Sequence, residues 1–241
     1  QEFQLQQASP GSRLEWIAGL YWFNDSASED NQSRVATGLY EALEALPGTI
    51  PGTPFGGAGN PVNLVFDIGF NSHFENETNS YAAYGQGTYS LTDRLKLTAG
   101  LRYTYEEKDV YLEAVRVATG RVAVAPTHNS DSWDAFTPRL ALDYSVSPDL
   151  LLYVSAARGF KSGGFNGRAL DANALQPYDP EFATTYEGGL KSEWFDRRLR
   201  ANLAVYYSDY TDIQLTAVTT VNGAIYAVTQ NVAEATLQGA E

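Results

Sequence analysis

A glycine-rich stretch, RGFKSGGFNG at residues 158–167, is the first place in this sequence where residue types and spacing suggest chemistry. Backbone amides of such glycines cradle phosphates when a Lys-Ser or Lys-Thr pair follows the last glycine and opens a helix. Here Lys161 and Ser162 precede Gly163, so the order required for nucleotide binding is absent. The pattern favours an external turn after a strand, and its simplest role is loop structure. Contact with an anionic ligand is the alternative, for which the candidate residues are Arg158, Lys161 and Asn166.

The remaining polar groups offer little for catalysis or metal binding. The chain has no cysteine and only two histidines, His73 and His128, which lie far apart in polar segments. The acidic run at residues 24–30 lacks the fixed spacing of a calcium loop. Acid–base and nucleophilic catalysis need groups within hydrogen-bond reach of one another. Scattered carboxylates and two loop histidines therefore predict no enzyme, no metal site and no cofactor.

Composition limits the elements that can position these residues. The 241 residues include 13% aromatic side chains and 21 glycines, a mixture that leans towards β-structure. No stretch of about 18 apolar residues occurs, which excludes a transmembrane helix, whereas a membrane-spanning strand needs only about 9 to 11 residues. A net charge of −13 opposes nucleic-acid binding. Because the sequence has no methionine, we expect a mature protein, a processed piece or a fragment.

The stretch YAAYGQGTYSLTDRLKLTAGLRYTYEE, residues 81–107, predicts a β-hairpin. From 95 to 105 the odd positions are Leu, Leu, Ala, Leu, Tyr and Tyr, while the even positions are polar or small. A strand points successive side chains to opposite faces, so one face is apolar and the other polar. Residues 92–94 form the turn. The same plan recurs at 136–160 and 186–207, and near the N-terminus after the turn at 10–12.

Aromatic spacing favours a membrane barrel over a soluble sandwich. Pairs of aromatic residues stand eight positions apart on the apolar faces, which is about 26 Å along a strand and, after tilting, close to the apolar band of a membrane. The predicted lipid-face girdle consists of Tyr81, Tyr89, Phe136, Tyr144, Tyr186 and Trp194. Trp133 is also interpreted as a girdle residue.

Connections and charges support the same interpretation. Short turns alternate with long polar connections at 25–80, 107–131 and 161–180, which we expect to be external loops. Charged residues on the polar faces are too costly to bury in a dry interior, so they must face water or another polar body. The predicted lumen-facing residues are Lys96, Arg102, Arg139, Glu187 and Lys191. Within the first connection, Leu39, Leu43 and Leu46 predict a short amphipathic helix that ends at Pro47.

Three segments together resemble the barrel region of TonB-dependent outer-membrane receptors. They are YAAYGQGTYSLTDRLKLTAGLRYTYEEKD, FTPRLALDYSVSPDLLLYVSAARGFKSGGFNG and YDPEFATTYEGGLKSEWFDRRLRANLAVYYSDYTDIQL. The resemblance implies an all-β fold, an antiparallel transmembrane β-barrel of about 22 strands filled by a plug domain. About ten or eleven strands can be counted here, so we expect a partial barrel, with residues 1–241 belonging to the barrel domain and with the plug outside the sequence.

The same resemblance implies a function and its partners. The expected function is active uptake of a small molecule, by default a ferric siderophore, across the outer membrane of a Gram-negative bacterium. The expected partners are outer-membrane lipid, the substrate, and the TonB complex acting through the plug. A passive porin-like or structural outer-membrane barrel is the alternative, and a soluble β-sandwich binding module is a weaker one. Solubility of the intact protein as a monomer without detergent would favour the sandwich.

Overall fold

The computed structural model describes residues 1–9, 11–34, 38–168, 175–221 and 224–241. Most of this length is strand. The elements in chain order are β1 Glu2–Gln7, β2 Leu14–Ser33, α1 Leu39–Glu44, the 3₁₀ helix η1 Pro61–Phe66, β3 Phe70–Ser90, β4 Leu95–Arg116, β5 Val122–Ser147, β6 Leu150–Lys161, β7 Gly164–Phe165, β8 Pro177–Tyr178, β9 Glu181–Trp194, β10 Leu199–Val221 and β11 Ala224–Ala240. The all-β prediction is confirmed.

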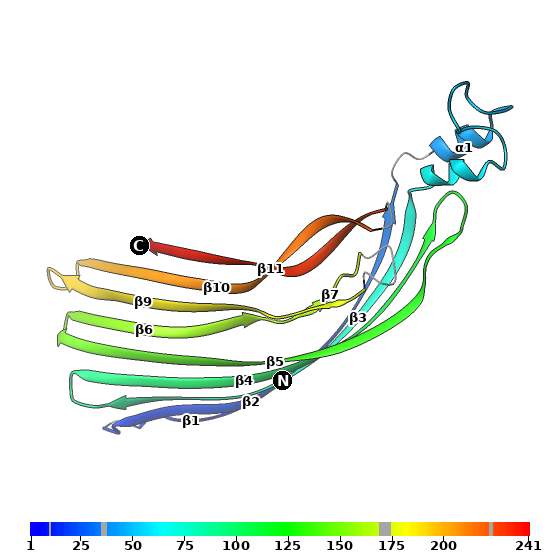
Figure 1. Cartoon of the computed structure of the whole chain (residues 1–241). Helices are drawn as coiled ribbons and strands as arrows, with labels where there is room; N and C mark the ends of the chain where they lie inside the picture. The colour runs from blue at the N-terminus through cyan, green and yellow to red at the C-terminus, as the bar shows by residue number, and fades with distance from the viewer. Residues whose placement is uncertain (10, 35–37, 169–174, 222–223) are drawn as a thin grey trace.

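Nine of these strands form one curved antiparallel sheet in the order β1-β2-β3-β4-β5-β6-β9-β10-β11 (Figure 1). Neighbours in the sheet are neighbours in sequence, except that β7 and β8 form a separate two-stranded ladder between β6 and β9. Such an up-and-down order is that of a membrane barrel wall. The predicted partial antiparallel barrel is therefore confirmed, with β1 and β11 at the two edges of the described sheet.

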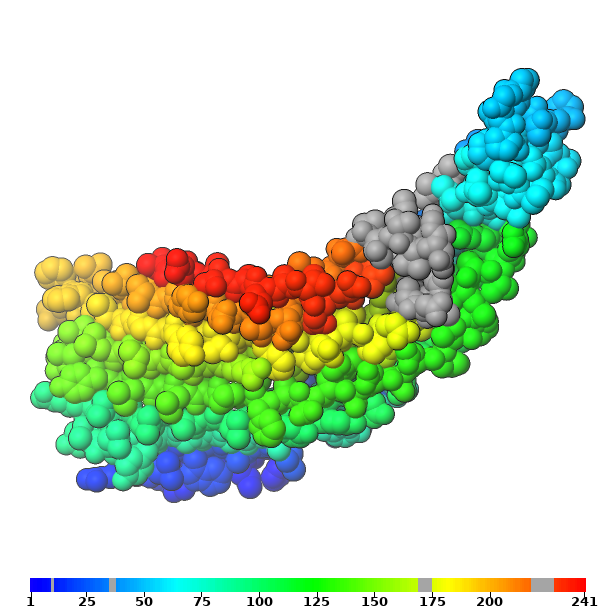
Figure 2. Space-filling model, in the orientation of Figure 1, coloured from blue at the N-terminus to red at the C-terminus, as the bar shows by residue number. Residues whose placement is uncertain are grey.

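The two ends of the sheet differ. Figure 1 shows the short β3–β4, β5–β6 and β9–β10 turns gathered at one end, opposite the β2–β3 connection. That connection folds into a small cap containing α1 and η1, which projects from the sheet in Figure 2. The predicted helix is confirmed at Leu39–Glu44 with Leu43 buried, and the turn at 10–12 is described except at residue 10.

Two of the predicted loops contain long stretches of strand at their ends, and their boundaries were wrong. The 25–80 connection narrows to 34–69, because Asp25 to Ser33 pair with Thr78 to Phe70. The 107–131 connection narrows to a turn at 117–121. Much of the sequence of these strand ends is polar on both faces, so it lacks the alternation of apolar and polar residues that identifies a strand. The strands form nevertheless, because the backbone hydrogen bonds between them do not require an apolar face. The 161–180 connection stands between β6 and β9, and contains β7 and β8.

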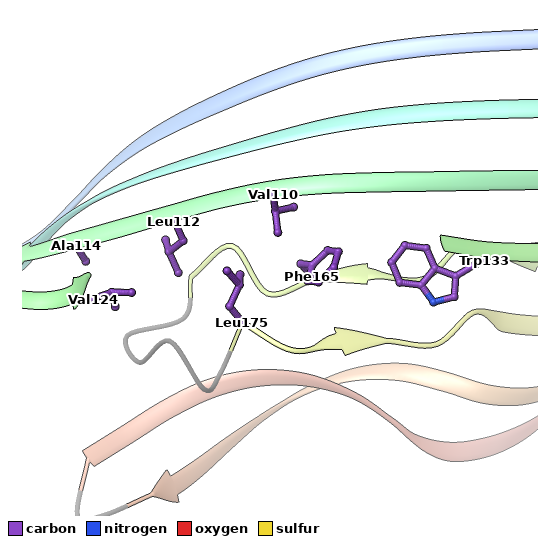
Figure 3. Packing of buried hydrophobic residues seen from close by; sticks show 7 residues of the cluster. All are labelled: Val110, Leu112, Ala114, Val124, Trp133, Phe165 and Leu175. Atoms are coloured by element: carbon purple, nitrogen blue, oxygen red, sulfur yellow. The ribbon is translucent and has the colours of Figure 1, made fainter. Parts of the chain in front are cut away.

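The register assigns every strand residue to one of two faces. We call the face that carries Leu101 and Phe136 the outer face, and the face that carries Lys96 and Arg102 the inner face. Exposed large apolar side chains crowd the outer face. The main buried cluster lies on the inner face, where the β6–β9 connection packs against β4 and β5 (Figure 3). Its members are Val110, Leu112, Ala114, Val124, Trp133, Phe165 and Leu175.

Candidate functional site: the inner face of the sheet

All six predicted girdle residues lie on the outer face. Their side chains are between 42% and 55% exposed, although all are large aromatics. Cross-strand neighbours complete two levels: Tyr81 stands opposite Tyr105, and Tyr186 stands opposite Tyr207. The ring centroids of Phe136 and Tyr103 are 4.8 Å apart. Exposed aromatic residues at two levels, with aliphatic residues between them, are the arrangement of a lipid-facing barrel wall. Their contact with lipid remains a prediction.

The predicted lumen-facing charges all lie on the opposite, inner face. Lys96 stands opposite Asp143, Arg102 opposite Thr137, and Glu187 opposite Tyr206. Arg139 lies between Gly100 and Ala157 on this face, and Lys191 stands opposite Leu151. The five residues come from three strands, β4, β5 and β9, and face the same side because the strand ladders are in register.

Tyrosines link many of these charges into contacts along the inner face. The Arg102 guanidinium lies 5.0 Å from the Tyr21 ring centroid and 5.7 Å from that of Tyr84. The Tyr84 hydroxyl donates to Oε1 of Glu2 at 2.6 Å. Cation–π contacts and charge-assisted hydrogen bonds satisfy groups that could not be buried alone.

A second group of this kind lies across β6 and β9. The Tyr153 hydroxyl donates to Oε1 of Glu187 at 2.6 Å, and Lys191 Nζ lies 5.4 Å from the Tyr153 ring centroid. The inner face is thus polar and aromatic, and suited to line an aqueous path or to contact another polar domain.

The three candidate ligand-binding residues do not share one surface. Arg158 occupies the outer face, opposite Thr184, with its guanidinium 4.0 Å from the Phe182 ring centroid. Lys161 stands opposite Glu181 on the inner side. Asn166 follows β7 within the connection, and its Oδ1 accepts from the Arg168 amide at 3.4 Å. Arg158 and Lys161 are only three positions apart in the sequence, but successive side chains of a strand point to opposite faces, so the two residues lie on different faces of the sheet.

Close packing explains three of the four glycines in the stretch that first suggested phosphate binding. A Cβ at Gly163 would lie 2.4 Å from the Trp133 ring and from the Tyr178 carbonyl oxygen. A Cβ at Gly164 would lie 2.7 Å from the Tyr178 hydroxyl, and one at Gly167 would lie 2.8 Å from the Phe74 ring. Gly163 and Gly167 allow the connection to lie directly on inner-face side chains, and Gly164 allows its two arms to approach each other, because a larger residue would collide there.

Trp133 was misassigned from sequence. It is not a girdle residue: it lies on the inner face, is 7% exposed, and packs edge-on against Phe165 with ring centroids 5.9 Å apart. The signal that could have found it is its parity, since Trp133 differs by an odd number of positions from Phe136 and so faces the opposite side.

Both histidines lie on strands and not in loops, beyond the aromatic level that contains Tyr81 and Tyr105. His73 Nδ1 is 2.7 Å from Asp30 Oδ1, and His73 Nε2 is 3.0 Å from Glu75 Oε1. These hydrogen bonds, that to Glu75 first and that to Asp30 second, raise the pKa of His73 above its ordinary value. The His128 ring lies 4.8 Å from that of Tyr111. Within the described part of the chain, no three His, Cys, Asp or Glu side chains are placed to hold a metal ion.

The helices of the described residues are short, and none is long and apolar enough to cross a membrane.

Comparison with known families agrees with this geometry. Residues 3–241 match the family model for the TonB dependent receptor-like β-barrel. The two-faced antiparallel sheet and this match define the class: the chain belongs to the TonB-dependent receptor family, as part of its β-barrel. Members of that family are transport receptors of the Gram-negative outer membrane, and not enzymes.

Two relatives of this chain are named as receptors. The chain is 28% identical to the metal-pseudopaline receptor CntO of Pseudomonas aeruginosa over 131 residues, which are 54% of this chain and 17% of that protein. It is 28% identical to the pesticin receptor of Yersinia pestis over 134 residues, covering 56% of this chain and 19% of that protein. The chain therefore matches about a fifth of the length of these relatives.

Solved structures share the fold. The ferric yersiniabactin uptake receptor FyuA of Yersinia pestis matches 99% of this chain and 30% of its own, with a TM-score of 0.72 and 18% identity. The siderophore receptor PiuA of Acinetobacter baumannii matches 99% of this chain and 34% of its own, with a TM-score of 0.63 and 16% identity. At these identities the likeness supports the barrel architecture alone.

Proposed function

We propose that the protein containing this barrel segment takes up a ferric siderophore through the outer membrane, with energy delivered by the TonB complex through a plug domain. The observation that carries the proposal is the family match over nearly the whole chain together with its two-faced sheet. Supporting it, CntO carries metal-pseudopaline in its name and FyuA is a ferric yersiniabactin uptake receptor. Because each relative is matched in part, the substrate class is a proposal.

The inner face is suited to this role. An outer face of exposed apolar side chains is compatible with lipid, while the opposite face carries Lys96, Arg102, Arg139 and Lys191 among hydroxyls and carboxylates. A hydrated wall of this kind can surround a plug and pass a polar chelate. Long connections at the end opposite the short turns would then face the cell exterior, where the substrate first binds.

Uptake in cells tests the proposal. The complete gene would be expressed in a receptor-deficient Gram-negative host grown under iron limitation, with and without a functional TonB. Radioactive iron bound to yersiniabactin, pyoverdine or a catecholate siderophore is the probe. We expect saturable uptake of at least one chelate that is lost without TonB. Uptake that is unchanged without TonB would support the passive porin-like alternative, and no uptake of any of the chelates would contradict siderophore transport.

A further inference from the structure

The described parts of the β6–β9 connection fold back onto the inner face instead of extending away from the sheet. Its two described arms are residues 162–168, which include β7, and residues 175–180, which include β8. Figure 3 shows Phe165 and Leu175 from these arms among side chains of β4 and β5. The arms also reach β3, where Gly167 lies against the Phe74 ring. They therefore cover part of the inner surface of three consecutive strands.

Polar groups of β4 and β5 hold one side of this connection. Lys108 Nζ donates to the Gly163 carbonyl oxygen at 2.7 Å, and it also pairs with Glu106 at 3.2 Å. Asn129 Nδ2 donates to the Leu175 carbonyl oxygen at 2.8 Å. Each bond satisfies a backbone carbonyl that has left the sheet ladder, which would otherwise be costly to cover.

Polar groups of β10 and β11 hold the other side. Gln214 Nε2 donates to the carbonyl oxygens of Ser162 at 2.9 Å and Asp179 at 3.0 Å. Asn231 Nδ2 donates to the Asp179 carbonyl oxygen at 2.8 Å, while the Asp179 amide donates to Asn231 Oδ1 at 2.7 Å. The arms are thus tied to strands on both sides of the β6–β9 pair from which they emerge.

Burial supports a permanent attachment. Leu112 and Leu175 are fully buried, and Trp133 and Phe165 are almost so. Segments that open easily have few buried apolar contacts. Here the contact between arms and sheet makes up the main apolar cluster of the described chain, so these arms belong among its most stable parts.

We propose that the two arms form a fixed wall that narrows the lumen on this side of the barrel, and that Lys108 and Gln214 are the residues that position it. This inference rests on the proposed transport function. The arms cover Trp133 and Leu112, so a substrate entering from the end with the long connections meets the arms, not the strand side chains beneath them. The wall therefore helps to set which chelates pass.

Thiol accessibility in the whole receptor tests whether the wall is fixed. Phe165→Cys introduces a thiol beneath the arm, and Ser132→Cys introduces one on the exposed opposite face of β5. In intact cells, a membrane-impermeant maleimide should label the thiol at 165 at least about tenfold more slowly than the thiol at 132. Equal labelling rates, or protection at 165 that disappears when a ferric siderophore is added, would mean a hinged segment and would overturn the proposal.

A matched pair of lysine variants tests the positioning role. Lys108 and Lys96 lie on the same strand and face, but Lys96 has no contact with the described arms. Added to the Phe165→Cys background, Lys108→Ala should restore labelling, and Lys96→Ala should not. Gln214→Ala should act like Lys108→Ala, with Asn202→Ala, on the same face of β10, as its control. Retention of heat-resistant migration in gels confirms that each variant is folded. If the thiol at 165 is equally protected from maleimide in Lys108→Ala and Lys96→Ala, Lys108 does not position the wall.

Substrate range separates a wall from mere stabilisation. In cells, Lys108→Ala should change the ratio of uptake of ferric yersiniabactin to ferric pyoverdine by about threefold or more, because a shifted wall alters the fit of differently sized chelates unequally. Ser132→Ala, on the outer face, should leave the ratio unchanged, whereas simple loss of folded receptor lowers both rates together. An unchanged ratio in Lys108→Ala would overturn the selectivity role. If the wild-type receptor takes up neither chelate, the proposed function fails for them, while the labelling result still decides whether the wall is fixed.

Discussion

Single side chains in this sheet are governed by the face that their position assigns to them. Leu101 and Gln86 illustrate the rule: they lie on neighbouring strands at nearly the same height, but Leu101 is on the outer face and Gln86 on the inner face. Leu101 is 50% exposed, an arrangement that water would disfavour and lipid would favour. Both side chains are exposed, so exposure does not distinguish them. The difference is in the surroundings that we predict: lipid at the outer face and water at the inner face.

Arginine substitutions test this assignment. In the whole receptor refolded into lipid vesicles, Leu101→Arg should lower the free energy of unfolding by about 2 to 4 kcal/mol, because Leu101 lies midway between the two aromatic levels. Gln86→Arg places the same charge on the inner face and should cost much less. Thr98, on the same face, would be a poor control, because it is buried and its hydroxyl lies 2.9 Å from that of Thr88. Urea titration provides the measurement, and equal losses would refute the assignment of faces.

His73 provides a pH-dependent contact at the strand ends outside the aromatic levels. Its imidazolium can donate to carboxylates of Asp30 on β2 and Glu75 on β3, and Glu113 on β4 stands opposite in the ladder. Hydrogen bonds raise the pKa of His73, so its stabilising effect is full below the ordinary histidine pKa and is lost as pH rises through the raised value. Deuterium exchange at the imidazole carbon, read by mass spectrometry, should give a pKa above the ordinary value.

Glu75→Gln is the informative variant for this contact. It keeps the size of the side chain but removes the carboxylate that contributes most to the raised pKa of His73. The pKa should fall towards the ordinary value while the Asp30 contact remains. A pKa that does not respond to Glu75→Gln would show that the contact is not formed in solution.

Strands on the inner face are joined by repeated tyrosine–glycine pairs. Tyr84 stands opposite Gly19, Tyr153 opposite Gly189, and Tyr206 opposite Gly239. At each glycine, a Cβ would lie within 2.9 Å of the tyrosine ring. Each ring therefore lies over its neighbouring strand, where it covers a backbone that would otherwise be bare. Such cross-strand pairs are a unit of sheet stabilisation.

Two adjacent glycines of β9 allow the effect of tyrosine packing to be distinguished from the intrinsic cost of glycine in a strand. A Cβ at Gly189 would lie 2.5 Å from the Leu203 carbonyl oxygen and 2.8 Å from the Tyr153 ring, whereas one at Gly188 would meet Val154 at 3.6 Å. In the whole receptor, Gly189→Ala should destabilise by about 1 to 3 kcal/mol through overpacking, while Gly188→Ala should change little. Urea unfolding in lipid measures both. Similar losses in the two variants would refute the close approach of Tyr153.

As a whole, the sheet has an open cross-section. Within the described residues, β1 is bonded to β2 alone and β11 to β10 and a short contact from the connection, so each leaves one edge unpaired in the sheet. Unpaired backbone groups are not tolerated in lipid, which is why membrane barrels close. Closure therefore requires further strands, in agreement with the share of the solved receptors, about a third, that this chain matches.

The segment on its own should consequently fail to form a monomeric barrel. Refolded in detergent, residues 1–241 should give polydisperse assemblies through pairing at β1 and β11, whereas the whole receptor should give one monodisperse species. Size-exclusion chromatography with light scattering makes the comparison. A monodisperse monomer of the segment, with resistance to heat denaturation in gels, would show that it closes by itself.

The sequence by itself determined the strands that cross the predicted membrane region and the faces of their residues. Alternation with period two fixes the face of a side chain locally, so Phe136 and Arg139 could be assigned to opposite faces without any tertiary information. The three resembling segments extended this to a family. Local pattern also predicted α1, because the spacing of Leu39 and Leu43 follows a helical period.

Only the tertiary structure decided the positions of the polar ends of the strands and of the β6–β9 connection. Polar strand ends such as 25–33 pair through backbone atoms, which leave no trace in side-chain pattern. The inward fold of the connection depends on contacts between residues far apart in sequence, such as Lys108 with Gly163 and Asn129 with Leu175. Glycine can mark a turn, a phosphate site or a close approach, and the role of Gly163 became evident once Trp133 was placed against it.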